Sequence, residues 1–129
     1  GNFLTAVDLG TGKSAINVTG THNSETCTIT NTYDLKCWGR GTEGGLGQEA
    51  LAHLGDNASE MGDFMVPIDL GSGRTVQRLA KAASCVVLDN KELKCWGKNN
   101  FGQLGLGDTT NRGGNTGDMG DNLPYIDLR

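Results

Sequence analysis

The 129-residue sequence is poor in the residues that build large cores, membrane spans or nucleic-acid-binding surfaces. Aromatic residues make up only 5% of the chain. No apolar run approaches the roughly 20 residues that a membrane-spanning helix needs. The formal net charge is −4 and no run of lysines or arginines occurs, so the basic surface typical of a nucleic-acid-binding protein is absent. We expect one small folded unit with no membrane span and no nucleic-acid partner.

Proline is also scarce, with 2 residues against 21 glycines, which excludes both a collagen-like chain and a proline-rich spacer. The chain begins at Gly1 with neither a methionine nor the apolar stretch of a signal peptide. We therefore expect a processed, excised or incomplete chain.

The sequence contains an internal repeat, which is the strongest indication of its architecture. A shift of 58 residues places Cys27 on Cys85 and superimposes 35–39 on 93–97, which both read Leu-Lys-Cys-Trp-Gly. Upstream of the first cysteine the shift becomes 61, and three extra residues within 21–26 explain the difference. The same pairing also matches Gly44 with Gly102, 46–47 with 104–105, 61–63 with 119–121, and 68–70 with 126–128.

Each copy is predicted to consist of short β-strands. In the second copy, residues 75–80 and 85–88 are β-prone, 93–96 alternate as a half-buried strand does, and 124–128 form another short strand. The residues at 89–92 are typical of a reverse turn. Four short strands in about 60 residues without helical periodicity are typical of a propeller blade.

The repeated motif, C-x9-C-W-G followed in the second copy by G-x-L-G-L-G and M-G-D-N-L-P-x-I-D-L, resembles the repeat of the regulator of chromosome condensation family. It is most similar to the cysteine-bearing versions of secreted or surface proteins. The first copy departs from the motif at 45–48. The resemblance implies an all-β chain of two four-stranded propeller blades, with 1–10 as the end of a preceding blade, 11–70 as repeat 1 and 71–129 as repeat 2.

Members of this family usually close about seven blades into a ring, within the range of known propellers. Two blades alone leave sheet faces and edges uncovered. We therefore expect part of a larger propeller, or a protomer whose blades stack on other copies in a ring or a helical filament.

The four cysteines form two identical C-x9-C pairs around presumed hairpins. Residues ten apart lie opposite one another in an antiparallel hairpin with a short loop, so we expect the disulfides Cys27–Cys37 and Cys85–Cys95. Zinc ligation and free buried thiols are the alternatives, although the C-x2-C and H-x3-H spacings of zinc sites are missing.

Disulfides require an oxidising compartment, so the cysteines predict an extracellular or cell-surface protein. Asn17 and Asn57 both begin glycosylation sequons, which supports a secreted glycoprotein. The alternative is a bacterial exported protein whose sequons are never used.

Residues that occur in both copies are expected to hold the blades together. Trp38 and Trp96 should pack against the disulfide and the neighbouring blade. The other repeated scaffold residues that we select are Gly39, Gly97, Asp69 and Asp127.

Two stretches suggest ligands, but each has a simpler explanation. The run at 10–14, Gly-Thr-Gly-Lys-Ser, resembles the end of a phosphate-binding loop, yet it lacks the first glycine and recurs as a turn at 71–75. The acidic, glycine-rich stretch 105–122 contains oxygen ligands for calcium but fails the EF-hand spacing. We expect turns capped by Asp and Asn side chains there, and no metal or cofactor.

We expect no enzymatic activity, because neither histidine is placed beside a nucleophile and an orienting acid, and the cysteines are assigned to disulfides. Residues unmatched between the copies are the candidates for partner binding on loops. These residues are His53, Glu60, Phe64, Phe101, Asn111 and Arg112.

The leading hypothesis is a non-enzymatic extracellular module whose blades form a scaffold for protein or glycan contacts, with self-assembly into a ring or fibre as a special case. The family resemblance alone suggests a guanine-nucleotide exchange factor for a small GTPase as one alternative. A lectin or calcium-dependent adhesion domain is the other.

Overall fold

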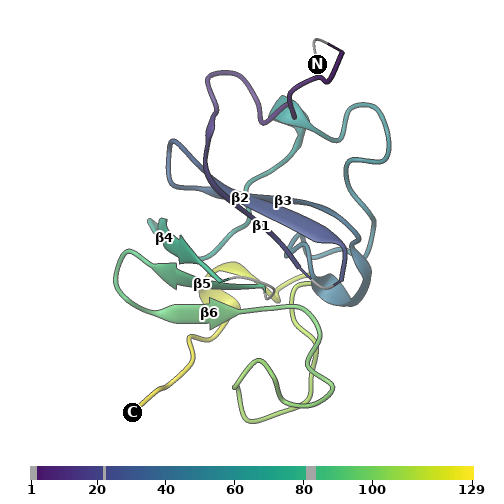
Figure 1. The fold of residues 1–129 in the computed structure, drawn as a ribbon. Coiled ribbons are helices and arrows are strands. Elements are labelled where there is room, and N and C mark those ends of the chain that lie inside the picture. The colour runs from purple at the N-terminus through teal and green to yellow at the C-terminus, as the bar shows by residue number, and fades with distance from the viewer. Residues whose placement is uncertain (1–2, 22, 81–83) are drawn as a thin grey trace.

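The computed structural model describes residues 3–21, 23–80 and 84–129, and this part of the chain is all-β without an α-helix (Figure 1). The strands form two antiparallel sheets, one in each repeat. The sheet of repeat 1 contains β1 (Ala15–Gly20), β2 (Glu25–Thr30) and β3 (Leu35–Gly39). The sheet of repeat 2 contains β4 (Val76–Leu79), β5 (Cys85–Leu88) and β6 (Leu93–Cys95). The prediction of two all-β repeats is therefore confirmed.

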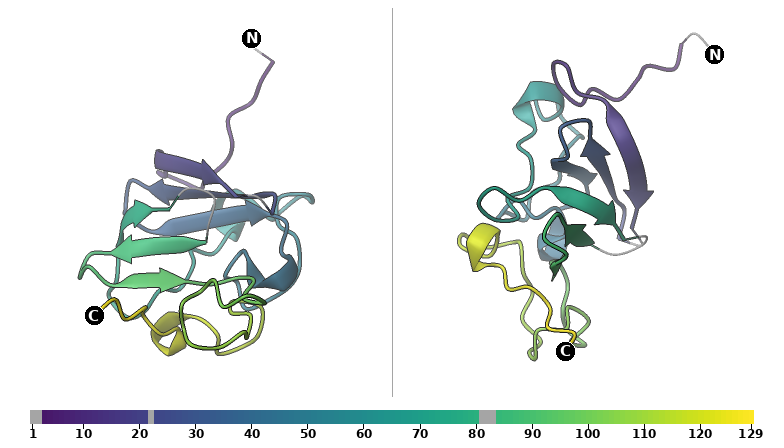
Figure 2. Two further views of the ribbon diagram at one scale, coloured as in Figure 1. Left: turned by 60° about the horizontal axis from the view of Figure 1, so that its bottom comes forward. Right: turned by 90° about the vertical axis from the view of Figure 1, so that its left-hand side faces the viewer.

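The described residues also contain three short 3-10 helices and no helix that is long and apolar enough to cross a membrane. These helices are η1 (Thr42–Gly44), η2 (Gly62–Phe64) and η3 (Gly120–Asn122). The two sheets are neighbours, and β4 contacts β1 and β2 (Figure 2).

The hairpins form where the sequence places turn residues between β-prone runs. In repeat 1, the Thr30 amide donates to the Asp34 carbonyl at 2.9 Å. In repeat 2, the Leu88 amide makes the same contact with the Glu92 carbonyl at 2.9 Å. The resulting register places Cys27 opposite Cys37 and Cys85 opposite Cys95.

Each described sheet has three strands, so the four-stranded blades that the sequence predicts are not observed. The predicted strand at 124–128 runs beside β6 with one backbone hydrogen bond, from the Ile126 amide to the Leu93 carbonyl at 2.8 Å. Ile68 makes the equivalent bond to Leu35 at 2.8 Å. In repeat 2 the ladder does not continue toward the start of this segment, because Pro124, two residues before Ile126, has no amide hydrogen to donate.

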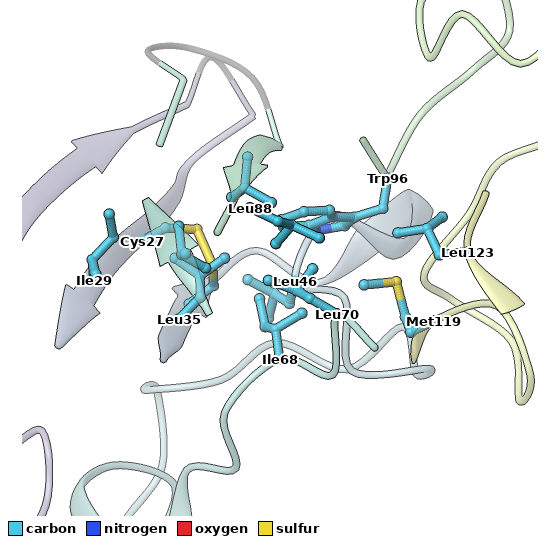
Figure 3. Packing of buried hydrophobic residues seen from close by; sticks show 13 residues of the cluster. Cys27, Ile29, Leu35, Leu46, Ile68, Leu70, Leu88, Trp96, Met119 and Leu123 are labelled. Atoms are coloured by element: carbon cyan, nitrogen blue, oxygen red, sulfur yellow. A yellow bond between two sulfur atoms is a disulfide. The ribbon is translucent and has the colours of Figure 1, made fainter. Parts of the chain in front are cut away.

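The hydrophobic core extends across both repeats (Figure 3). Its centre brings Leu46 and Ile68 of repeat 1 together with Leu88 and Trp96 of repeat 2. Leu35, Leu46 and Leu88 have no exposed surface. Burial of such side chains is favourable by about 1.5–3 kcal/mol each, so the two sheets stabilise one another through this shared core.

A buried lysine fastens the segment that enters each repeat. The Lys36 ammonium donates to the carbonyls of Leu9 at 2.8 Å and Gly62 at 3.0 Å. In repeat 2, the Lys94 ammonium donates to the carbonyls of Leu70 at 3.0 Å and Gly120 at 2.9 Å. Because a buried ammonium is costly without partners, these bonds explain why a lysine is tolerated there.

The repeated aspartates hold the turns beside these lysines. Asp69 accepts the Gly71 amide at 3.0 Å, and Asp127 accepts the Arg129 amide at 3.0 Å. Asp121 accepts both the amide and the hydroxyl of Ser72, at 2.9 Å and 2.6 Å. The repeated aspartates therefore accept hydrogen bonds that fix the backbone of these turns.

Candidate interaction surface

The cysteines lie in two pairs, one in each sheet. The sulfur atoms of Cys27 and Cys37 are 2.06 Å apart, and those of Cys85 and Cys95 are 2.01 Å apart. Both pairs join the second and third strands of their sheet, and no cysteine of the chain is free. These two pairs are compatible with an extracellular location.

Trp96 connects the two repeats. Only 2% of its surface is exposed, and its indole Nε1 donates to the Gly45 carbonyl of repeat 1 at 2.9 Å. Gly47 lies against the same ring, since a Cβ atom there would come within 3.0 Å of Nε1. Trp96 therefore packs on the neighbouring repeat, and only a residue without a side chain fits at position 47.

The backbone of repeat 1 continues this contact. The Glu49 amide donates to the Gly113 carbonyl at 2.8 Å. The Glu49 carboxylate accepts the amides of Gly117 and Met119, both at 3.0 Å. Gly44 has φ +80°, and a Cβ atom there would lie 2.5 Å from the Arg112 carbonyl. This close approach of two backbones requires glycine.

We call residues 44–49 of repeat 1 the docking loop, and Trp96 with residues 112–119 of repeat 2 the docking seat. The 58-residue shift defines the equivalent loop, residues 102–107, and the equivalent seat, Trp38 with residues 54–61. The equivalent seat is only partly buried, and three residues of the equivalent loop, Gln103, Gly105 and Gly107, are exposed, whereas Leu104 is buried. A cavity of about 400 Å³ lies at the open seat, lined by Trp38, Leu54 and Gly55.

The exposure of individual residues shows the same difference. Residues 44–47 are all buried, whereas Gln103 and Gly105 at the equivalent positions are exposed. Gly113 of the filled seat is buried, whereas Gly55 of the open seat is exposed. The chain therefore carries one filled loop-and-seat contact and the two halves of a second one.

The N-terminal segment is also uncovered. The 61-residue shift places Leu4 and Val7 on Met65 and Ile68. Leu4 is 86% and Val7 is 56% exposed, whereas Met65 is 2% and Ile68 is 6% exposed. Leu4 and Val7 therefore occupy two positions of the repeat that are buried at the junction between repeat 1 and repeat 2.

Three of the residues that were selected because they differ between the two copies accept hydrogen bonds from backbone amides in turns. His53 Nδ1 accepts the Gly41 amide at 3.0 Å, and Asn111 Oδ1 accepts the Asn99 amide at 2.8 Å. Glu60 accepts the Gly55 amide at 2.8 Å, as Asp118 of the other repeat accepts the Gly113 amide at 3.0 Å. At each pair of equivalent positions, two different residue types therefore accept the same backbone amide. This indicates a structural role for His53, Asn111 and Glu60.

The remaining candidates lie apart from one another. Phe64 is 69% exposed at the end of η2, and Phe101 is 86% exposed beside a cavity between the repeats. Arg112 forms an ion pair with Asp108 at 2.8 Å. The structure does not gather these side chains into one site, and partner binding by them stays a prediction.

Both sequon asparagines are exposed, Asn17 on β1 and Asn57 in a loop. The Asn57 side-chain amide donates to Asp56 at 3.1 Å and Glu60 at 3.3 Å. Glycosylation at either asparagine stays a prediction.

The two ligand-like stretches are occupied by internal contacts. Lys13 forms an ion pair with Asp34 at 2.8 Å, and Asp118 accepts three successive amides, those of 113–115. The Arg112 guanidinium and the Thr110 amide hold the pKa of Asp108 below its usual value. The described residues contain no group of three or more histidine, cysteine or carboxylate side chains arranged to hold a metal.

Sequence reasoning missed most of the docking contact, because Gly45 and Gly113 contribute carbonyl groups that any residue carries. Glu49 was also missed, although position 107 is glycine and the difference between the copies was visible. Of the residues in this contact, Trp96 and Arg112 were selected from the sequence.

Comparison with known families agrees with this architecture. Residues 82–103 match the family model of the Regulator of chromosome condensation (RCC1) repeat. The matched stretch includes β5, β6, the second disulfide and Trp96. A search of curated proteins found no match. The chain contains an RCC1-type repeat, its two sheets fit propeller blades, and such repeats suggest a protein-interaction module.

Proposed function

We propose that the chain is a non-enzymatic interaction module of an extracellular protein, and that its repeats bind further repeats of the same kind head to tail. One observation carries this proposal. The docking loop of repeat 1 fills the Trp96 seat, while the matching Trp38 seat is open and Gln103, Gly105 and Gly107 of the matching loop are exposed, although Leu104 between them is buried. A second copy of this chain supplies the missing half of each.

The filled contact predicts the contacts of the open one. By the 58-residue shift, the Trp38 indole of one copy donates to the Gln103 carbonyl of the next. Gly105 lies against the Trp38 ring as Gly47 lies against Trp96. The Gly107 amide donates to the Gly55 carbonyl, as the Glu49 amide does to Gly113.

The proposed contact joins two different surfaces of the chain, so it is heterologous. Repeated addition of such contacts closes into a ring or grows into a helical filament, depending on the rotation between neighbours. In either case the uncovered residues 3–7 would lie beside a neighbouring repeat, which accounts for the exposure of Leu4 and Val7.

The extracellular part of the proposal is supported by one disulfide pair in each repeat and by two exposed sequons. The non-enzymatic part is supported by the internal contacts of the acids and of His53, which hold turns. The exposed loops that remain, including that of Phe101, are then free for protein or glycan contacts.

The experiment uses two variants, each with one damaged half of the contact. Trp38→Ala removes the ring of the open seat. Gly105→Asn adds a side chain where a docked loop has no room, and asparagine tolerates the positive φ of this position, +70°. Each variant alone should lose self-association, while an equimolar mixture should form a one-to-one complex through the one intact pair of surfaces.

Gly107→Asn is the matched control. Position 107 has φ +80° and nothing within 4 Å of a Cβ atom, and its equivalent in the filled contact is Glu49, which already carries a side chain. This control should associate like the original chain. Light scattering measures the masses of the three variants, of the original chain and of the equimolar mixture. Equal behaviour of the two asparagine variants, or no complex in the mixture, would contradict the proposal.

A further inference from the structure

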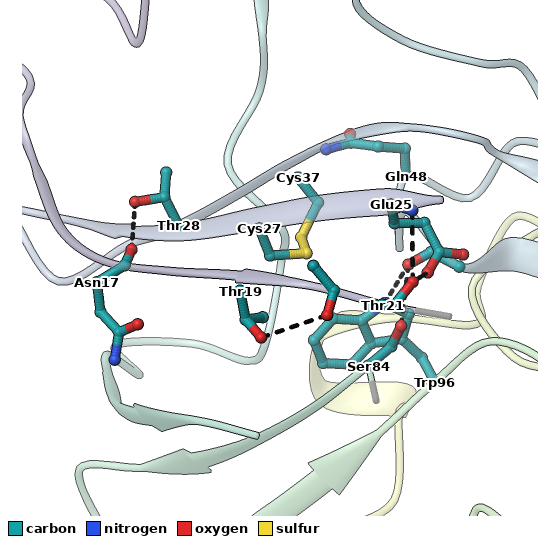
Figure 4. Close-up of a disulfide and its surroundings, with 12 residues drawn as sticks. Asn17, Thr19, Thr21, Glu25, Cys27, Thr28, Cys37, Gln48, Ser84 and Trp96 are labelled. Carbon is teal, nitrogen blue, oxygen red and sulfur yellow. Dashed lines mark hydrogen bonds between the residues drawn. A yellow bond between two sulfur atoms is a disulfide. The ribbon is translucent and has the colours of Figure 1, made fainter. Parts of the chain in front are cut away.

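A cavity of about 430 Å³ lies between the two repeats, within the size range of ligand-binding pockets. Thr21, Glu25 and Glu43 line it from repeat 1, and Trp96, Lys98 and Phe101 line it from repeat 2. Figure 4 shows Thr21 and Glu25 beside Trp96 and Ser84. This cavity is separate from the open seat at Trp38.

Part of the cavity wall in repeat 1 comes from the stretch 21–26, in which the two repeats differ. The three extra residues of repeat 1 lie within 21–26, the stretch that contains Thr21 and Glu25. At the position of Glu25 the second copy has Ala83, and at the position of Gly45 it has Gln103. A Cβ atom at Gly45 would lie 1.8 Å from Glu25 Oε1, so this glycine makes room for the carboxylate.

Glu25 is a buried acid that faces the cavity. Only 3% of the residue is exposed, and its Oε2 accepts the Thr21 hydroxyl. Its Oε1 accepts no hydrogen bond from the residues that the structure describes. Glu25 is one of the residues that line the cavity, which places its carboxylate at the cavity wall.

Among the described residues that line the cavity, two are acidic, Glu25 and Glu43, and one is basic, Lys98. The Lys98 ammonium lies 3.3 Å from Glu43, and this ion pair uses the cation that lines the cavity. Glu25 forms no ion pair with a described lysine or arginine. A buried carboxylate is costly unless it is paired or fully hydrogen-bonded, so a cationic group is the most favourable occupant.

We infer that this cavity binds the cationic end of a lysine or arginine side chain from a partner protein. The ammonium or guanidinium group donates to Glu25 Oε1 and replaces the water that solvates it. The alkyl stem lies along the apolar surfaces of Trp96 and the exposed Phe101, as long basic side chains commonly do. A cation near Phe101 is attracted by the face of its ring as well. The cavity lies within one chain, but Gln103 and Leu104 of the loop 102–107 also line it, so its test is made at a concentration at which the chain is monomeric.

The experiment is a titration of the intact, disulfide-bonded chain with N-acetyl-arginine amide and N-acetyl-lysine amide, followed by amide and indole nuclear magnetic resonance shifts. The neutral control is N-acetyl-norleucine amide, at the same ionic strength. The two basic compounds should saturate shifts at the Trp96 indole, Ser84 and Gly97, and norleucine should not. Equal shifts with all three compounds, or no shifts, would overturn the inference.

Variants locate the contact on Glu25. Glu25→Gln should weaken arginine binding by about tenfold, as expected for loss of a charged hydrogen bond. Glu92→Gln removes the same charge at a partly buried position that does not line the cavity, so it should change affinity less than about twofold. Equal effects of the two variants would contradict the inference. Phe101→Ser, at an exposed position, should weaken binding by about threefold through lost ring contact and gives a second readout if Glu25→Gln destabilises the fold.

Discussion

Repeat 1 and repeat 2 each have a three-stranded sheet, a disulfide between its second and third strands and a buried lysine. Several of their equivalent residues nevertheless differ in burial. Trp96 is 2% exposed, whereas Trp38 is partly exposed. In the opposite direction, Leu70 is 5% exposed and its equivalent Leu128 is 78% exposed. Because the residue types are identical, the presence of a neighbouring repeat accounts for the difference. In each pair, the residue that is buried lies at the junction between the two repeats.

The largest expected effect separates the two tryptophans. Trp96→Ala should lower the free energy of unfolding by about 3–5 kcal/mol, because a large buried ring is lost and the Gly45 carbonyl loses its donor. Trp38→Ala should lower it by only about 1 kcal/mol in dilute solution, because its seat is empty. Denaturant titration at low protein concentration measures both. Similar losses would show that the two seats do not differ.

The next effect should be equal in the two repeats. Removing one disulfide, by Cys27→Ala with Cys37→Ala or by Cys85→Ala with Cys95→Ala, should cost about 2–3 kcal/mol in either case. Both bridges close loops of the same length, with a sequence separation of 10, and the entropy gained by the unfolded chain depends on that length.

Thermal unfolding of the two double variants, compared with the original chain under oxidising conditions, measures these costs. A difference above about 1 kcal/mol between them would show that local packing, rather than loop closure, determines the value of each bridge.

The smallest effect concerns pH and should again match between repeats. Hydrogen bonds from Thr11 hold the pKa of Asp63 below its usual value of 3.8, and those from Ser72 do the same for Asp121. A carboxyl with a lowered folded pKa adds stability above its unfolded value and loses it as the pH falls toward the folded value. The melting temperature should therefore fall as the pH drops below about 4.

Asp63→Asn and Asp121→Asn should each flatten that fall by a similar amount, and each should lower stability at neutral pH. A melting profile across acidic pH for the two variants provides the test. Flattening by only one of them would show that the two turns are not equivalent.

Much of the fold was predictable from residue patterns. The run 85–88 is the observed strand β5, and 75–80 and 93–96 lie within one or two residues of β4 and β6. These segments were identifiable because alternation and turn residues are local properties of the chain. The segment 124–128 was wrongly predicted as a strand, since one hydrogen bond to Leu93 does not make a ladder.

The contact between repeats was less accessible from the sequence, for a physical reason. Gly45 and Gly113 act through their carbonyl groups and through the absence of a side chain, which a residue pattern does not distinguish from an ordinary turn. His53 and Asn111 accept hydrogen bonds from equivalent backbone amides. Because they are different residue types, a comparison of residue identities did not show that they have the same role. Glu25 had a signal that was not used, because the second copy has Ala83 at the same position.

The most direct test of the central claim is sedimentation equilibrium of the unmodified, disulfide-bonded chain across a wide range of concentration. The open Trp38 seat and the open loop 102–107 predict a mass that rises with concentration above the 13.6 kDa of one chain. A well-folded particle that stays at 13.6 kDa at every concentration would contradict the account.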